Sequence, residues 1–590
     1  LKRVDRLASS YLSVVFNKKR LIIASVAGFF LILLIACSVA VMVASNNTQT
    51  SSGSNSHQKN TGSSPEKEPK KEKEEKEDVP KIVQKICNTT KNQKLCTDTL
   101  SKEKGKSPKE LVKAAITAVD DEIQQVLAKA GSFKLKNPKE EAAFEDCREL
   151  MADAREELDY SAITVTNDGK MNQTAPELNN WLSAVMSYQQ TCIDGFPDGQ
   201  TKTDMEKAFN KSKQLTSNSL AMVDGLASFI ASIENAGAAA SRHLLAEKPS
   251  VHADGLPSWM NPEARRILKA AEKKEKPKPN VTVAKDGSGD FKTITEALAA
   301  LPRKYEGRYV IFVKEGIYDE TVTVDKKMVN ITMYGDGSKK TIVTGNKNFV
   351  DGVQTFRTAT FVVLGEGFVG QAMGFRNTAG PEKHQAVALR VQADRSIFLN
   401  CRFEGYQDTL YVQTHRQFYR SCVIVGTVDF IFGDAAVIIQ NSQIIVRKPL
   451  DNQQNIVTAQ GRVDEHEHTA IVLQNCRIEP DTDLVPVKEK IKSYLGRPWK
   501  DYSRTIVMES TIEDIIHPDG WLPWEGEKGL KTLYYAEFNN KGAGSKTTSR
   551  VKWPGYHVIT KSEAEKFTVG SFYEGEWITA TGSPVHFGLY

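Results

Sequence analysis

Four hexapeptides of one pattern decide the fold of the C-terminal half of the chain: FLNCRF at 398–403, YRSCVI at 419–424, IQNSQI at 439–444 and LQNCRI at 473–478. The first three start 21 and 20 residues apart, at positions 398, 419 and 439. A repeat of about twenty residues is the length of one coil of a parallel β-helix, in which equivalent positions stack in ladders. A Cys/Ser ladder inside such a core is usually packing rather than redox chemistry.

Short β-branched runs separated by Gly, Asn and Asp support this prediction throughout residues 280–590. The clearest runs are 308–313, 329–334, 360–364, 396–399, 437–439 and 471–473. Long helical periodicity is rare there, with 293–301 as the main exception. We therefore predict an all-β parallel β-helix domain over residues 280–590.

Residues 80–235 have a different pattern. Apolar residues recur at three- and four-residue spacing in the segments 111–128, 140–162, 179–194 and 205–233, with Pro and Gly between them. This predicts an all-α four-helix bundle. In an oxidising compartment the natural cysteine pairs are Cys87 with Cys96, a local bridge, and Cys147 with Cys192, which would join two long helices.

The N-terminus indicates the compartment. Residues 21–44 carry no charged side chain, are long enough to cross a bilayer, and follow a basic segment at 1–20. We expect an uncleaved signal-anchor with a cytosolic N-terminus rather than a cleaved signal peptide, which would have a shorter apolar core. The polar stretch 45–79 is predicted to be a disordered stalk. Either type of N-terminus sends the rest of the chain into the secretory pathway.

The linker at 236–279 contains two basic-aliphatic tetrapeptides, RHLL at 242–245 and RRIL at 265–268. In an exposed linker, such tetrapeptides are candidate sites of proteolytic processing. On composition alone, they could equally be charged residues of a solvated loop. The residues concerned are Arg242, Leu245, Arg265, Arg266 and Leu268.

The composition argues against several classes of function. A formal net charge of +5 on 590 residues gives no reason to expect a nucleic-acid partner. The eight cysteines form no CxxC pair, and the histidines are too scattered to complete a zinc set. We therefore expect no metal and no cofactor.

Three dense polar motifs interrupt the strand-like runs: HQAVALR at 384–390, GYQDTLY at 405–411 and GTVDFIFG at 426–433. Gln385 and Gln407 lie 22 residues apart, and Asp408 and Asp429 lie 21 apart. With one coil of that length, these side chains would stack on one face. Neighbouring strands are about 4.8 Å apart, so the two carboxylates would be close neighbours.

An isolated aspartate in a loop is more often a turn former than a catalytic residue. A stacked pair of aspartates, in contrast, points to acid–base chemistry. Two adjacent carboxylates do not both ionise easily, so one holds a proton while the other stays anionic. The glutamine amides could donate to an oxyanion. The motif LGRPW at 495–499 adds Arg497, a possible bidentate partner for a carboxylate, and Trp499, which could stack on a sugar ring.

Residues 280–590 closely resemble the plant pectin methylesterase family. The resemblance rests on the Gln385, Asp408 and Asp429 motifs, on GIYDE at 316–320 and on LGRPW at 495–499, in the family's order. Residues 80–235 similarly resemble the pectin methylesterase inhibitor domain that precedes many such enzymes, with the same two disulfides. The resemblance implies a right-handed β-helix with its active site in a long surface groove.

The resemblance also assigns roles. Asp429 would be the nucleophile on methyl esters of homogalacturonan, and Asp408 the proton donor and later the base. Gln407, with Gln385, would stabilise the oxyanion. Arg497 would hold Asp429, and it would contact substrate together with Trp499. Thr355, in QTFRTAT at 354–360, matches a substrate-contacting threonine.

Three further expectations follow from the family. The tetrapeptides of the linker resemble its processing motifs, so a membrane-anchored precursor would yield a mature enzyme in the extracellular cell wall. The bundle would cover the groove until cleavage, with a folding or retention role as the alternative. A separate inhibitor protein is a further partner that the family allows. A family pattern that often pairs Cys422 with a later cysteine meets Ser442 here, so we expect free thiols.

Two rival functions lead to different measurements. A pectate lyase, also β-helical, would depend on calcium and yield unsaturated products that absorb in the ultraviolet. A catalytically silent binding protein would have no reason to carry both aspartates, both glutamines and Arg497. The spacing and the motifs favour the esterase.

Overall fold

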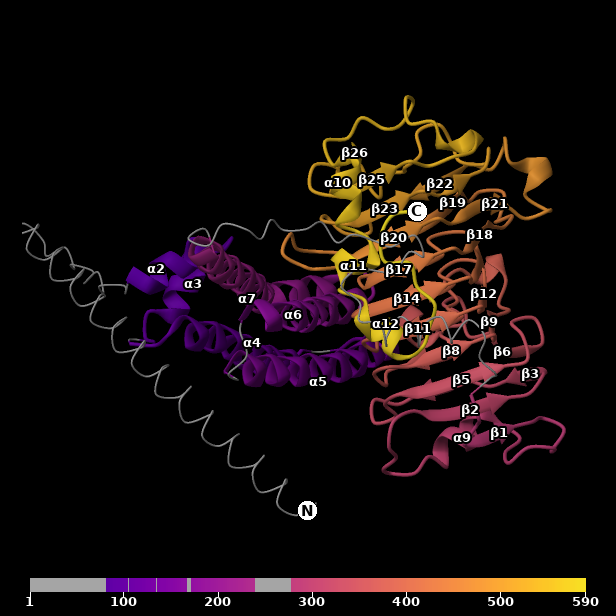
Figure 1. Ribbon diagram of the computed structural model, residues 1–590, viewed down its shortest axis with the longest axis horizontal. Coiled ribbons are helices and arrows are strands. Elements are labelled where there is room, and N and C mark those ends of the chain that lie inside the picture. The colour runs from indigo at the N-terminus through magenta and orange to yellow at the C-terminus, as the bar shows by residue number, and fades with distance from the viewer. Residues whose placement is uncertain (1–80, 104, 134, 167–170, 239–276) are drawn as a thin grey trace, which may run out of the picture. The chain divides into compact units, whose positions relative to one another are not determined.

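The computed structural model describes residues 81–103, 105–133, 135–166, 171–238 and 277–590. From residue 281 onward, three parallel sheets stack coil upon coil (Figure 1). All pairings within the sheets are parallel, and each strand inside a sheet pairs with the strand one coil before and one coil after it, as Leu389, Leu410 and Ile431 illustrate. The predicted parallel β-helix is confirmed.

The largest sheet has eleven strands. They are β1 (Val281–Val283), β2 (Tyr309–Val313), β5 (Ile331–Gly335), β8 (Val369–Gln371), β11 (Ser396–Leu399), β14 (Arg416–Arg420), β17 (Ala436–Gln440), β20 (Ala470–Gln474), β23 (Arg504–Met508), β25 (Tyr534–Phe538) and β26 (Tyr556–Val558). The six runs predicted as strands correspond to β2, β5, β11, β17 and β20 of this sheet and to β7 (Phe361–Val363) of the seven-stranded sheet. Helix α9 (Ile294–Ala299) lies within the predicted helical exception.

The other two sheets complete each coil. The seven-stranded sheet consists of β4 (Val322–Val324), β7 (Phe361–Val363), β10 (Leu389–Val391), β13 (Leu410–Val412), β16 (Ile431–Gly433), β19 (Asn455–Gln460) and β22 (Ser493–Gly496). The eight-stranded sheet consists of β3 (Gly316–Asp319), β6 (Thr341–Gly345), β9 (Gly374–Asn377), β12 (Arg402–Glu404), β15 (Val423–Gly426), β18 (Gln443–Val446), β21 (Arg477–Pro480) and β24 (Thr511–Ile512).

The hexapeptide repeat forms the tight turn between a strand of the eleven-stranded sheet and the following strand of the eight-stranded sheet. Its third residue is left-handed in every copy, with φ of 51°, 53°, 52° and 51° at Asn400, Ser421, Asn441 and Asn475. Asparagine tolerates this conformation better than most residues because its short polar side chain can bond locally. The fourth residue points into the core, where Cys401, Cys422 and Cys476 are buried free thiols, as expected.

Aromatic stacks fill the coil interior. Phe398 stacks on Tyr419 with ring centroids 4.9 Å apart, and Phe375 stacks on Phe403 at 5.6 Å. All four rings are fully buried. Each such ring removes roughly 150–250 Å² from water, which makes the interior the main source of stability.

Three short helices near the C-terminus were not predicted: α10 (Lys561–Glu565), α11 (Val569–Phe572) and α12 (Glu576–Ala580). Their apolar residues, with Phe567 and Phe587, pack against outward-facing residues of the eleven-stranded sheet such as Phe418 and Ile438. Helices of four or five residues give too short a periodic pattern to be recognised in a sequence.

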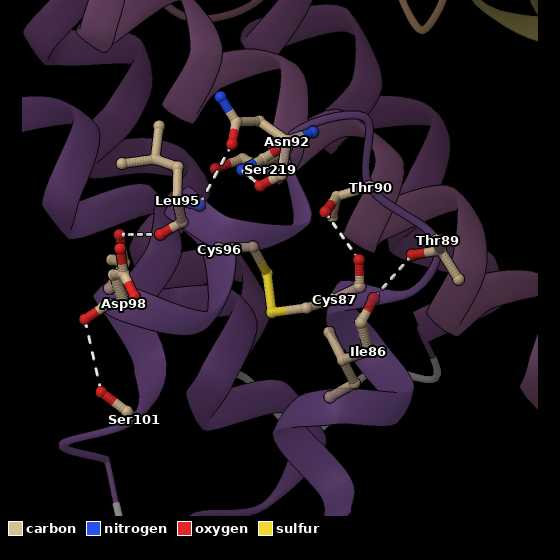
Figure 2. The surroundings of a disulfide bond; sticks show 12 residues. Ile86, Cys87, Thr89, Thr90, Asn92, Leu95, Cys96, Asp98, Ser101 and Ser219 are labelled. Atoms are coloured by element: carbon tan, nitrogen blue, oxygen red, sulfur yellow. Dashed lines mark hydrogen bonds between the residues drawn. A yellow bond between two sulfur atoms is a disulfide. The ribbon is translucent and has the colours of Figure 1, made fainter. Parts of the chain in front are cut away.

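The N-terminal helices are α2 (Lys81–Cys87), α3 (Gln93–Leu100), α4 (Pro108–Ala130), α5 (Pro138–Thr166), α6 (Met171–Asp194) and α7 (Gln200–Ala238). The four long ones cover the four predicted segments, and two short helices precede them. Disulfides join Cys87 to Cys96 and Cys147 to Cys192, the pairs expected from the sequence. Figure 2 shows the first of them beside the turn between α2 and α3.

Within the described ranges, no helix is long and apolar enough to cross a membrane. The predicted span at 21–44 and the stalk at 45–79 lie outside those ranges, as do the tetrapeptides at 242–245 and 265–268.

Candidate active site

The two aspartates occupy equivalent positions in adjacent coils. Each stands two residues before its strand, Asp408 before β13 and Asp429 before β16, and these strands pair Leu410 with Ile431. The backbone N–H of Asp408 donates to the carbonyl of Val428 at 3.1 Å, which fixes the stacking directly beside the carboxylates. The stacking predicted from the spacing of 21 residues is therefore present.

Both aspartates have a left-handed backbone, with φ of 63° at Asp408 and 50° at Asp429. Left-handed non-glycine residues are uncommon, and strained positions of this kind cluster at active sites. The surrounding ladder of backbone hydrogen bonds holds the conformation: Thr427 donates to Tyr406 at 2.9 Å, and Phe430 donates to Ile456 at 3.3 Å. The side chains are therefore positioned by the coil and not by a mobile loop.

Arg497 binds Asp429 through a bidentate pair of hydrogen bonds. Its Nε donates to Oδ1 at 2.8 Å and its Nη2 donates to Oδ2 at 2.5 Å. Arg497 directly follows β22, and its own N–H donates to the carbonyl of Thr458 at 3.0 Å. The guanidinium also lies 4.2 Å from the ring centroid of Trp524, which limits its movement.

The surroundings of the two carboxyl groups give them different tendencies to ionise. Burial and the neighbouring charge of Asp429 raise the pKa of Asp408 well above its ordinary value, against a smaller lowering effect from Arg497. Burial also raises the pKa of Asp429, but the charge and hydrogen bonds of Arg497 limit the rise. Asp408 is thus the group that holds a proton, and Asp429 is the group that ionises first.

A cavity of about 310 Å³ opens over this pair. Every residue proposed from the sequence as catalytic or substrate-binding lines it: Thr355, Gln385, Gln407, Asp408, Asp429, Arg497 and Trp499. Gln385 and Gln407 are half-buried, and within the described residues their side-chain amides have no hydrogen-bond partner. Their N–H groups are therefore available to an oxygen inside the cavity. None of the described residues forms a group of three or more His, Cys, Asp or Glu side chains arranged to hold a metal ion.

Apart from Trp499, the sequence analysis missed the aromatic walls of this cavity. Tyr411 and Phe432 are partners in the register of β13 and β16 and stack with ring centroids 4.3 Å apart. Phe432 meets Trp499 edge-on at 6.0 Å. Phe349, Phe356 and Trp524 complete the lining. The register could have identified Tyr411 and Phe432, because each stands three residues after a stacked aspartate.

The bundle also contributes to the lining, through Thr191 and Asp194 of α6 and the following Gly195. Lys500 Nζ donates to Asp194 Oδ1 at 2.7 Å. Gln354, beside the predicted Thr355, donates to the carbonyl of Gly195 at 3.4 Å. The end of α6 and the turn after it therefore lie in the same cavity as the two aspartates.

The comparisons with known proteins match both parts of the chain. The pectinesterase family matches residues 280–576, and the plant invertase/pectin methylesterase inhibitor family matches residues 81–222. Probable pectinesterase/pectinesterase inhibitor 13 of Arabidopsis thaliana is 56% identical over 518 residues, which span 86% of this chain and 82% of that protein. Putative pectinesterase/pectinesterase inhibitor 45 of the same plant is 56% identical over 522 residues, 87% and 85% of the two chains.

Among solved structures, pectin methylesterase from carrot is 52% identical with a TM-score of 0.53, and it matches 54% of this chain and 100% of its own. These matches agree with the separate folds of the two parts. The chain therefore belongs to the pectinesterase family and is a carboxylic ester hydrolase, with a plant invertase/pectin methylesterase inhibitor domain ahead of its β-helix.

Proposed function

We propose that the chain hydrolyses the methyl esters of homogalacturonan, through an acyl-enzyme on Asp429, to give free galacturonate and methanol. The observation that carries this proposal is the stacked pair of buried aspartates, of which one is held by Arg497 and the other is driven to keep its proton. Neither group needs a cofactor for this chemistry.

In the first half-reaction, the ionised carboxylate of Asp429 attacks the ester carbonyl carbon. Negative charge develops on the carbonyl oxygen, where the free amide N–H groups of Gln407 and Gln385 can stabilise it. When the tetrahedral intermediate collapses, the bond to the methoxy oxygen breaks, and Asp408 donates its proton to form methanol. The galacturonyl group is left joined to Asp429 as a mixed anhydride.

In the second half-reaction, Asp408 is now ionised and takes a proton from water. The resulting hydroxide attacks the galacturonyl carbon, and the same amides hold the oxyanion. Collapse of this intermediate releases the galacturonyl group as its acid, which ionises to galacturonate in water, and restores Asp429 as a carboxylate and Asp408 as an acid, so the cycle closes. Thr355 and Trp499 would position the sugar beside the aspartates.

The test is methanol release by the β-helix domain, with Asp429→Asn and Asp408→Asn beside the unaltered protein. Removing one member of a covalent catalytic pair should lower kcat by about 10³-fold or more. Asparagine retains the size and the tolerance of the left-handed backbone, so circular dichroism should be unchanged. Rapid quenching followed by mass spectrometry should find galacturonate on the peptide that contains Asp429. Full methanol release by Asp429→Asn would contradict the proposal.

We further propose that the bundle closes the active site until the linker at 236–279 is cut, after which the mature enzyme acts in the cell wall. The support is the position of Asp194 and Gly195 in the catalytic cavity. Comparing the uncut chain with a chain that begins at Lys269 tests this: the shorter chain should release methanol much faster. Equal rates would leave the bundle a folding or retention role.

A further inference from the structure

Lys500 is a cation beside the cavity, in contact with the lining residues Asp194 and Trp499, and the proposed reaction does not use it. It follows Trp499 directly, and its ammonium lies 4.9 Å from the centroid of that ring. Its side chain is 17% exposed while the bundle is in place. Within the part of the chain that the structure describes, Asp194 is its one salt-bridge partner, at 2.7 Å. Without the bundle, Lys500 would therefore keep its position beside the Trp499 ring with its charge unpaired.

The carboxylate of Asp194 contacts Lys500 as the carboxylate of a bound ligand would. One of its oxygens accepts from Lys500, and it also accepts from Gln190 one turn earlier on α6, at 2.9 Å. The other oxygen is buried in the cavity without a hydrogen-bond partner among the described residues. Buried polar atoms normally find partners, so this oxygen is one of the few unsatisfied buried atoms among the described residues.

The carboxylate of Asp194 lies beside the reacting centre and not on it. Arg497 bonds Asp429, whereas Lys500 bonds Asp194. Two of the three guanidinium nitrogens of Arg497 donate to Asp429. Two cations with separate partners therefore lie at this cavity: Arg497 lines it and pairs with Asp429, and Lys500 lies beside it and pairs with Asp194.

A partly esterified homogalacturonan carries groups that could bind Lys500 in place of Asp194, because each de-esterified sugar has one free carboxylate. We propose that Lys500 forms a subsite for the free carboxylate of a galacturonate that neighbours the reacting ester, and that Asp194 occupies this subsite when the bundle is in place. This inference rests on the proposed function. It makes Lys500 a residue that determines specificity, and it gives Asp194 the role of a substrate mimic.

The pattern of charges in the bundle agrees with such mimicry. Helix α5 supplies carboxylates to cations of the β-helix: Asp146 to Arg357 at 2.7 Å and Asp153 to Lys326 at 2.6 Å. Helix α6 adds Glu177, which bonds Arg416 at 2.6 Å. Like pectin, the bundle approaches the β-helix mainly with carboxylates.

The experiment uses the β-helix domain, which should fold alone because its core is built from its own residues and because the carrot enzyme consists of the corresponding part. Initial methanol release is measured on fully esterified pectin and on randomly half-esterified pectin. Lys500→Gln should lower the ratio of kcat/KM on the half-esterified to that on the fully esterified substrate by about tenfold, the usual worth of a hydrogen-bonded charge. Lys500→Arg should restore most of the ratio.

The matched control is Lys490→Gln, which removes an exposed lysine paired with Asp451 and should leave the ratio unchanged. An equal loss on both substrates, or no loss on either, would overturn the subsite. If the unaltered domain releases no methanol from either substrate, the proposed function fails instead.

A second variant lies outside the β-helix and cannot disturb its folding. In the uncut chain, Asp194→Asn removes the charge that Lys500 binds, so methanol release should rise several-fold, whereas Glu145→Gln on the exposed side of α5 should not change it. No rise with Asp194→Asn, against a clear rise on cutting the linker, would show that Asp194 does not occupy the subsite.

Discussion

At the scale of single residues, the division of work between two identical side chains depends on Arg497. Both carboxyl groups are almost completely buried, with exposed fractions of 7% at Asp408 and 5% at Asp429. Burial alone would raise both pKa values, and a protonated Asp429 could not attack. The two hydrogen bonds from Arg497 act on Asp429 alone. One guanidinium therefore makes the pair asymmetric.

Arg497→Gln should move the acid limb of the pH profile upward. Asp429 must be ionised to react, so activity falls as the pH drops through its pKa. Because Arg497 lowers that pKa, its removal should shift the acid limb of kcat/KM to higher pH. The measurement is kcat/KM for methanol release between acid and neutral pH. An unmoved limb with a uniformly lower rate would show that Arg497 acts on substrate and not on Asp429.

At the scale of one element, the left-handed turn in each coil sets the register of everything after it. Asn400 has φ of 51° and is exposed, so its backbone conformation can be tested without disturbing the core. Alanine has neither the freedom of glycine nor the local bonding of asparagine in this conformation.

Asn400→Ala should lower the free energy of unfolding of the β-helix domain by about 1 kcal/mol. Asn400→Gly should cost less, since glycine adopts the turn without strain and loses only chain entropy. Chemical denaturation of the two variants beside the unaltered domain measures the difference. Equal loss in both would place the effect in the asparagine side chain and not in the backbone.

Much of the β-helix and its site could be predicted because stacking makes spacing along the chain equivalent to proximity in space. Asp408 and Asp429 were brought together by a spacing of 21 residues, and β10, β13 and β16 keep that register. Trp524 could not be found in this way, since it lies in a loop whose path no repeat defines. The lining residue Asp194 belongs to another domain, and periodicity within one domain carries no information on what docks against it.

At the scale of the whole chain, opposite charges and one buried histidine join the bundle to the β-helix. His415 contacts Glu157 at 3.2 Å and Asn180 at 3.1 Å. Tyr188 from the bundle and Asp394 and Arg416 from the β-helix also face it. Burial would lower the pKa of His415, but the charge and hydrogen bond of Glu157 raise it above its ordinary value.

Docking of the bundle should therefore weaken as the pH rises. A histidine with a raised pKa contributes fully below its ordinary pKa of about 6.5, and that contribution is lost as the pH passes the raised value. Asp146 and Asp153 act in the same direction, because burial raises their pKa values despite their cationic partners.

The measurement is the ratio of methanol release by the uncut chain to release by the chain that begins at Lys269. This ratio should rise from acid to mildly alkaline pH, and His415→Gln should flatten the rise. A ratio that falls with pH would contradict this account of the interface.

The constant coil length around the aspartates has a consequence for protein engineering. Partner residues in the site's sheet advance evenly from Leu389 to Leu410 and Ile431, and then by a longer step to Thr458. The longer step includes an exposed turn at Asp451 and Asn452. A peptide tag or a fluorescent domain spliced into that turn would lengthen a coil that already varies, and the enzyme would stay active. The same insertion between residues 409 and 428 would carry the nucleophile out of line with its proton donor.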